Sequence, residues 1–102
     1  MHLVQALLPV VDDAGERFDD SVFDTVRREL TDRFGGVTAF MRSPAVGLWK
    51  KPSGAIDRDE VVTVEVMVDG LDRQWWRGYR DELARRFRQE ALVVRAIALE
   101  SL

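Results

Sequence analysis

Two stretches of this 102-residue sequence, RRELTDRF at residues 27–34 and RDELARRF at residues 80–87, are nearly the same octamer. Five positions are identical at a constant offset of 53 residues: Arg27/Arg80, Glu29/Glu82, Leu30/Leu83, Arg33/Arg86 and Phe34/Phe87. Apolar residues extend the match in steps of three, four and four, through Phe23, Val26, Leu30 and Phe34 and through Trp76, Tyr79, Leu83 and Phe87. Because this spacing places side chains on one face of an α-helix, the sequence predicts two similar amphipathic helices.

Residues that commonly begin and end helices flank both octamers. Asp19, Asp20 and Ser21 can cap the start of the first helix, and Ser21 has capping-box spacing to Asp24. The pair Gly35-Gly36 is typical of a helix end. The second helix is expected to begin near residues 70–72 and to continue to about Gln89.

Apolar, β-branched segments precede and follow each predicted helix. They predict four strands, at His2–Val10, Val37–Arg42, Val61–Val68 and Leu92–Leu99. The order βαββαβ predicts one α+β domain over residues 1–102 with a ferredoxin-like arrangement. We therefore expect a four-stranded antiparallel sheet of order 4-1-3-2 with both helices on one face. Residues 51–54, Lys-Pro-Ser-Gly, have the composition of a tight hairpin turn between the halves.

The third predicted strand indicates which side of the sheet the helices cover. Its valines at positions 62, 64, 66 and 68 share one side, whereas Glu65 lies on the other, where its charge stays near water. The same argument turns Gln5 and Arg95 away from the helices. Apolar residues flank them on that side: Leu3, Leu7, Phe40, Val93, Ile97 and Leu99. A largely apolar uncovered face predicts an interaction surface, and we expect a homodimer.

Arg95, Glu65 and Gln5 are the main candidate ligand-binding residues. They lie on three strands that are neighbours in the predicted order, so they are expected to form a polar line in an apolar floor, as in small-molecule pockets. Arg95 would hold a carboxylate or polarise a carbonyl group, and Glu65 would accept a proton. The simpler interpretation is an ion pair between strands or subunits that fixes their register. No catalytic residue can be assigned.

Trp49 is the fourth candidate ligand-binding residue. Pro44 and Gly47 suggest a bulged or irregular edge strand before it, which could place its indole over the mouth of a pocket. Alternatively, Trp49 packs beneath the hairpin or in a dimer contact.

Other aromatic and basic residues have ordinary structural interpretations. Trp76 continues the apolar stripe of the second helix and is expected in the core, with Trp75 at the rim of the core or at an interface. The basic cluster Arg85, Arg86 and Arg88 could bind an anion, but acidic neighbours favour a solvated helix face.

Composition excludes several classes of function. The sequence contains no cysteine and a single histidine, His2, so we predict neither a bound metal nor a cofactor. The net charge of −3 and the pI of about 5.1 argue against nucleic-acid binding. No apolar run approaches the roughly 20 residues that span a bilayer, and the N-terminal segment lacks the basic region of a signal peptide. We expect no membrane association and a cytoplasmic location.

Three elements together resemble a family of small bacterial proteins of unknown function. They are Arg33-Phe34-Gly35-Gly36 with Thr38, then Gly47-Leu48-Trp49, and finally Tyr79 with Arg86-Phe87-Gln89-Glu90. The resemblance extends over nearly the whole chain. It implies a ferredoxin-like fold and carries no activity or catalytic residues.

These observations favour a homodimeric domain that binds a ligand or protein on its helix-free sheet face. One alternative is a cofactor-independent enzyme of the dimeric α+β barrel kind, acting on a small carbonyl or aromatic substrate. Another is a regulatory amino-acid-binding module, because such domains share the βαββαβ order.

Overall fold

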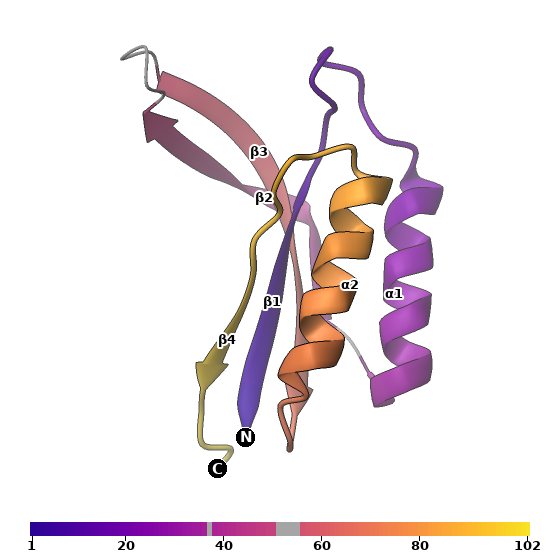
Figure 1. Cartoon of the computed structure of the whole chain (residues 1–102), viewed down its shortest axis with the longest axis vertical. Helices are drawn as coiled ribbons and strands as arrows, with labels where there is room; N and C mark the ends of the chain where they lie inside the picture. The colour runs from indigo at the N-terminus through magenta and orange to yellow at the C-terminus, as the bar shows by residue number, and fades with distance from the viewer. Residues whose placement is uncertain (37, 51–55) are drawn as a thin grey trace.

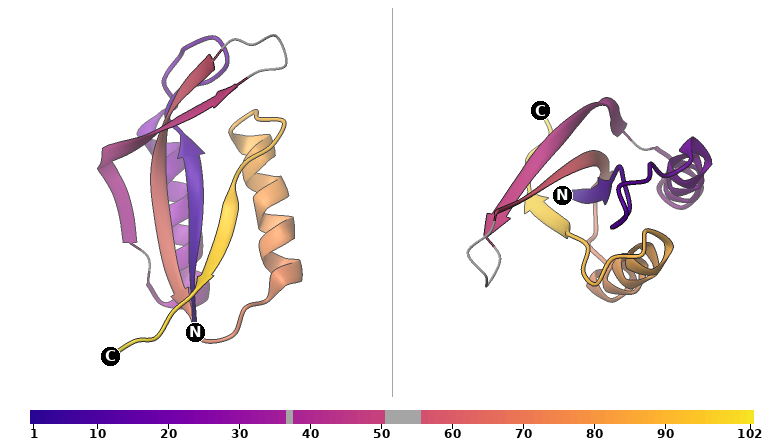
Figure 2. Two further views of the ribbon diagram at one scale, coloured as in Figure 1. Left: turned by 90° about the vertical axis from the view of Figure 1, so that its left-hand side faces the viewer. Right: turned by 90° about the horizontal axis from the view of Figure 1, so that it is seen from above.

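The computed structural model describes residues 1–36, 38–50 and 56–102, and it contains two helices and one antiparallel sheet. The elements are β1 (His2–Pro9), α1 (Asp20–Phe34), β2 (Thr38–Lys50), β3 (Ile56–Val68), α2 (Arg73–Arg86) and β4 (Val94–Ala98). The strands lie in the order β2-β3-β1-β4, which is 4-1-3-2 when read from β4. Both helices cover the same face of the sheet, as Figures 1 and 2 show. The predicted α+β class is confirmed.

Both helices begin at an aspartate. Asp19 caps α1, its Oδ1 accepting a hydrogen bond of 2.9 Å from the Ser21 backbone N–H, so the cap is the first of the three predicted capping residues. Asp72 caps α2 through a 3.1 Å bond from the Trp75 N–H. At the end of α1, Gly35 has a φ of 81°, a left-handed conformation that glycine adopts without strain.

The end of α2 differs from the prediction. The helix ends at Arg86, three residues before Gln89, because Arg88 adopts a left-handed conformation with a φ of 51°. The backbone N–H of Gln89 then turns back to the Ala84 carbonyl at 2.8 Å, which is the bonding pattern of a Schellman-type helix end. No glycine marks this end, so no residue type in the sequence indicated it.

The strands β2 and β3 are longer than predicted. Residues between the predicted strand ends at Arg42 and Val61 are also paired, up to Lys50 opposite Ile56. The register shifts between Phe40 and Ala45, and β2 is an edge strand, so the irregular edge strand suggested by Pro44 is present. The predicted strand ended at Arg42, whereas β2 runs through Pro44 and Gly47 to Lys50. The predicted turn at residues 51–54 lies outside the described residues.

The core lies between the sheet and the helices. Val62, Val64 and Val66 of β3 are 1–3% exposed and pack with the apolar stripes of both helices. The predicted orientation of the valines, with Glu65 on the opposite side, is therefore correct. Strand β4, Val94–Ala98, is shorter than the predicted Leu92–Leu99. The Val93 carbonyl still accepts a 2.9 Å hydrogen bond from the Leu7 backbone N–H.

Neither α1, with 15 residues, nor α2, with 14, is long and apolar enough to cross a membrane. This statement covers only helices within the described ranges.

Candidate functional site

Three polar side chains form a row across the helix-free face of the sheet. In the strand register, Gln5 of β1 lies between Glu65 of β3 and Arg95 of β4. Gln5 Nε2 donates a 2.6 Å hydrogen bond to Glu65 Oε2, and Arg95 Nε donates a 2.8 Å bond to Gln5 Oε1. The structure thus brings together three of the four candidate residues. The Gln5 carboxamide links the two charged groups, a detail that the sequence did not predict.

The alternation of side chains along β1 explains why this row faces away from the helices. Val4, Ala6 and Leu8 are buried beneath the helices, so Gln5 points to the opposite side. Because each residue of β1 pairs with one residue on either side, the register fixes the row of three. Alternation along the sequence determines the faces, whereas the register depends on how the strands pair.

Apolar residues border the polar row on both sides. On one side Leu3 pairs with Met67 and Ile97, residues that are 61% and 47% exposed. On the other side Leu7 lies beside Val93, which is 53% exposed. A hollow of about 100 Å³ lies at this end of the face, lined mainly by apolar residues that include Leu7 and Val93. The predicted apolar floor is present at the described positions.

The two ends of the row keep unused hydrogen-bonding capacity. Within the described part of the chain, Gln5 is the only side chain that accepts a hydrogen bond from Arg95. Likewise, one oxygen of Glu65 is bonded to Gln5, and its other oxygen has no described donor. A guanidinium and a carboxylate at opposite ends of one row can therefore bind complementary charges.

Trp49 is not brought to this row by any described contact. Its backbone lies in β2 and pairs with Asp57 of β3. Its side chain lies outside the described part of the structure, so the predicted position over a pocket mouth stays a prediction.

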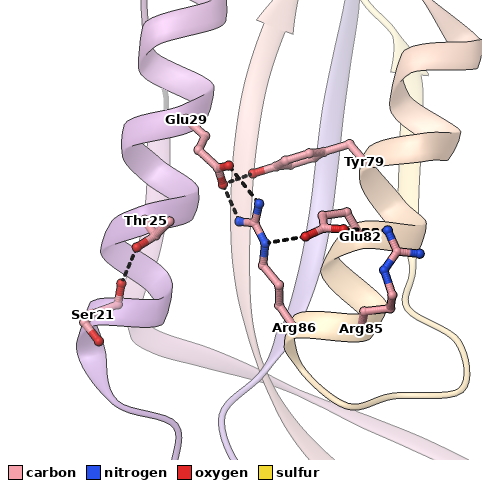
Figure 3. Close-up of polar contacts among 7 residues, drawn as sticks. All are labelled: Ser21, Thr25, Glu29, Tyr79, Glu82, Arg85 and Arg86. Atoms are coloured by element: carbon pink, nitrogen blue, oxygen red, sulfur yellow. Dashed lines mark hydrogen bonds and ion pairs between the residues drawn. The ribbon is translucent and has the colours of Figure 1, made fainter.

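A second polar cluster joins the two helices (Figure 3). Arg86 of α2 donates hydrogen bonds to both carboxylate oxygens of Glu29 on α1, the Nη2–Oε2 distance being 2.8 Å. Arg86 Nε also donates to Glu82 at 3.1 Å, and the Tyr79 hydroxyl donates to Glu29 at 3.2 Å. A bidentate arginine–carboxylate pair has a strict geometry, so this cluster fixes the position of α2 against α1.

Burial and charge shift the pKa values in the inter-helix cluster. Hydrogen bonds from Arg86 hold the pKa of Glu29 below its ordinary value of 4.5, so this carboxylate stays charged. Burial is the main cause of the raised pKa of Tyr79, with the nearby Glu29 charge adding to it. Tyr79 therefore keeps its proton and acts as a donor. Each polar side chain in the cluster is hydrogen-bonded to another member of it, which is typical of a structural role.

The predicted basic cluster at the end of α2 is divided among acidic partners. Arg85 pairs with Glu82, Arg86 pairs with Glu29, and Arg88 lies 3.2 Å from Asp12. In the N-terminal loop, Asp12 Oδ1 accepts the backbone N–H groups of Ala14 and Glu16. Each of these three arginines is therefore paired with an acidic residue of the same chain.

The paired tryptophans occupy their expected places. Trp76 is 6% exposed and stacks on Phe34, with ring centroids 5.1 Å apart and planes inclined by 7°. Trp75 is partly buried at the edge of the core and stacks on Tyr79. The Arg33 guanidinium lies 4.1 Å from the Trp75 ring centroid, a cation–π geometry. The interpretation of Trp76 as core and Trp75 as rim is correct.

The inter-helix cluster was not identified from the sequence. In the repeat Glu29 is equivalent to Glu82, and Arg86 is equivalent to Arg33, so the contact joins two different repeat positions. Helical spacing indicates only pairs within one helix, such as Glu82 with Arg86.

Comparisons with known proteins yield structural similarity alone. No family model matches the chain, and no curated protein matches it. A solved phage SAM lyase in complex with S-methyl-5′-thioadenosine is similar in structure, with a TM-score of 0.61 and 18% identity over 94% of this chain and 79% of that one. A phage SAM lyase in the apo state gives a TM-score of 0.55 and 15% identity over 99% and 91% of the two chains. At these identities the likeness shows a shared fold.

Proposed function

We propose that this chain is a ferredoxin-like binding domain that pairs with a second copy of itself through its helix-free sheet face. The observation that carries the proposal is the row Arg95–Gln5–Glu65, bordered by exposed apolar side chains. Apolar surface favours association because burying it removes it from water. The charged ends of the row would set the relative orientation of the two copies.

The order of charges along the row is self-complementary. The positive Arg95 and the negative Glu65 lie at opposite ends, with the neutral Gln5 at the centre. A two-fold axis in the interface and parallel to β1 would exchange the two ends, so Arg95 of each copy would lie over Glu65 of the other. An axis across the strands would instead place Arg95 over Arg95. The charges therefore favour the first arrangement.

The apolar borders fit the same arrangement. An axis parallel to β1 keeps each position along the strand, so Leu3 and its exposed neighbours Met67 and Ile97 would meet the same residues of the second copy. Three large side chains that now contact water would be buried together. This burial would supply most of the affinity, and the charges would supply the specificity.

Charge reversal tests the proposed pairing. Glu65→Arg and Arg95→Glu would each place like charges together, and each is expected to weaken dimerisation by about tenfold or more. The double variant restores opposite charges in the reversed order and is expected to recover dimerisation. Sedimentation equilibrium over a range of concentrations measures the effect, with Arg28→Glu on the exposed face of α1 as the control.

Two outcomes would contradict the pairing. A wild-type mass of one chain at every concentration up to about 100 μM would exclude a dimer of the affinity proposed here. Equal association of wild type, both single variants and the double variant would show that the row does not lie in the interface.

A second candidate function is an enzyme related to the phage SAM lyases. It is favoured by structural likeness over nearly the whole chain and by the carboxylate of Glu65, which could attract the positive sulfonium of SAM. Incubation with SAM, followed by chromatography for S-methyl-5′-thioadenosine, tests it. Under the binding-domain proposal no product forms. Product that disappears in Glu65→Gln, with the fold retained, would support the enzyme instead.

A further inference from the structure

A groove of about 220 Å³ lies between α2 and the edge strand β4. Figure 2 shows these two elements side by side at the edge of the sheet. Three arginines of α2, Arg73, Arg77 and Arg80, line the groove and follow one another at helical spacing. The floor is apolar, with Val4, Leu71 and Val94 among its residues. The groove therefore combines apolar surface with concentrated positive charge.

Two of the three arginines keep their charge uncompensated within the described part of the chain. Arg80 is hydrogen-bonded to its neighbour Asp81 at 3.2 Å. Arg73 and Arg77 are exposed and make no described ion pair. The nearby Asp72 is occupied as the cap of α2 through its bond to the Trp75 N–H. An anion entering the groove would meet two guanidinium groups, each able to bind a carboxylate through two hydrogen bonds.

Further donors lie beside the groove. Trp76 lines the groove and is 6% exposed, and its Nε1–H is buried with no acceptor among the described atoms. Buried donors are nearly always bonded in proteins, so this indole marks an unsatisfied position next to the groove. In addition, Leu7 and Val93 are a hydrogen-bonded pair, so by alternation the N–H groups of Val94 and Ala96 point toward the open edge of β4.

We infer that the groove between α2 and β4 binds a small organic anion: a carboxylate held by Arg73 and Arg77, with an aromatic or aliphatic body on the apolar floor. The volume of the groove matches a ligand of modest size. The groove lies on the helix-covered side of the sheet, whereas the proposed dimer surface lies on the other side. Arg95 borders the groove, and its side chain bonds Gln5 on the helix-free face.

Titration with 4-phenylbutyrate, followed by backbone amide NMR, tests the site. Shifts are expected in the first half of α2, in β4 and at the Trp76 indole N–H. 4-Phenylbutylamine, with similar shape and opposite charge, is expected not to bind, and inorganic phosphate, which lacks an apolar body, is expected to bind more weakly. The double variant Arg73→Gln/Arg77→Gln should weaken phenylbutyrate binding by about tenfold or more, whereas Arg28→Gln on α1 should leave it unchanged.

A single conservative change keeps the test decisive should the double variant fail to fold. Arg77→Lys retains the charge but loses the planar fork, and it is expected to weaken binding less than the double change. Equal binding of the amine and the carboxylate would overturn the site, as would equally tight binding of phosphate. Shifts confined to Gln5 and Glu65, or no shifts up to about 10 mM ligand, would also overturn it.

Discussion

Replacing Phe87 with alanine is expected to destabilise the fold by about 3–5 kcal/mol, the largest effect among the single substitutions considered. Phe87 is 0% exposed, and its ring contacts Phe18 edge-on at 5.0 Å and Phe23 at 5.5 Å between centroids. Truncation would remove these contacts and leave a cavity where α2 meets the first loop and α1. Because a domain of this size is stable by about 5–15 kcal/mol, the variant would be close to unfolding.

The internal repeat provides the matched control. Phe34 occupies the equivalent position in the first octamer, but it is only partly buried at the edge of the core. Phe34→Ala is therefore expected to cost about 1–2 kcal/mol. Urea denaturation followed by tryptophan fluorescence gives both values. Equal losses for the two variants would show that the halves of the repeat contribute alike, contrary to the burial seen in the structure.

The sequence predicted which side of each helix and strand faces the core better than it predicted the contacts between elements. One charged residue, Glu65, among alternating valines was enough to orient β3, because an unpaired buried carboxylate is costly. The same argument oriented Gln5 and Arg95 correctly. The apolar stripes of the helices were also correct, since periodicity depends only on local geometry.

Features that depend on packing between elements could not be predicted. The pairing of Glu29 with Arg86 depends on how the two helices pack against each other. The groove beside Arg73 and Arg77 depends on the distance between α2 and β4. The length of the second strand was also predicted too short. Pro44 and Gly47 correctly indicated an irregular edge strand, but the predicted strand ended at Arg42, whereas β2 continues to Lys50.

Replacing Arg86 with methionine is expected to destabilise the fold by about 2 kcal/mol near neutral pH. The change keeps much of the apolar stem but removes the bidentate contact with Glu29 and the bond to Glu82. Two carboxylates would then face each other without the guanidinium between them. The value lies between those of surface and buried ion pairs because the side chains of Arg86 and Glu29 are 27% and 38% exposed.

Arg85→Met is the matched control on the same helix. Arg85 pairs only with Glu82 among the described residues, and its side chain is 68% exposed. The loss is therefore expected to stay below about 0.5 kcal/mol. A similar loss for both variants would indicate that helix charge, rather than the contact between α1 and α2, is responsible.

The pH dependence of the Arg86→Met effect tests whether the carboxylate partners of Arg86, Glu29 and Glu82, account for the loss. Arg86 holds the pKa of Glu29 below its ordinary value of 4.5 in the folded protein. A carboxylate with a lowered folded pKa contributes stability above the unfolded pKa, and it loses that contribution as the pH falls through the folded value. The difference between wild type and Arg86→Met should therefore be largest near pH 7 and should narrow below pH 4.5. Urea denaturation at both ends of this range measures it. A difference that stays constant with pH would assign the loss to the packing of the Arg86 stem, because only the ionised carboxylates of Glu29 and Glu82 gain from the guanidinium.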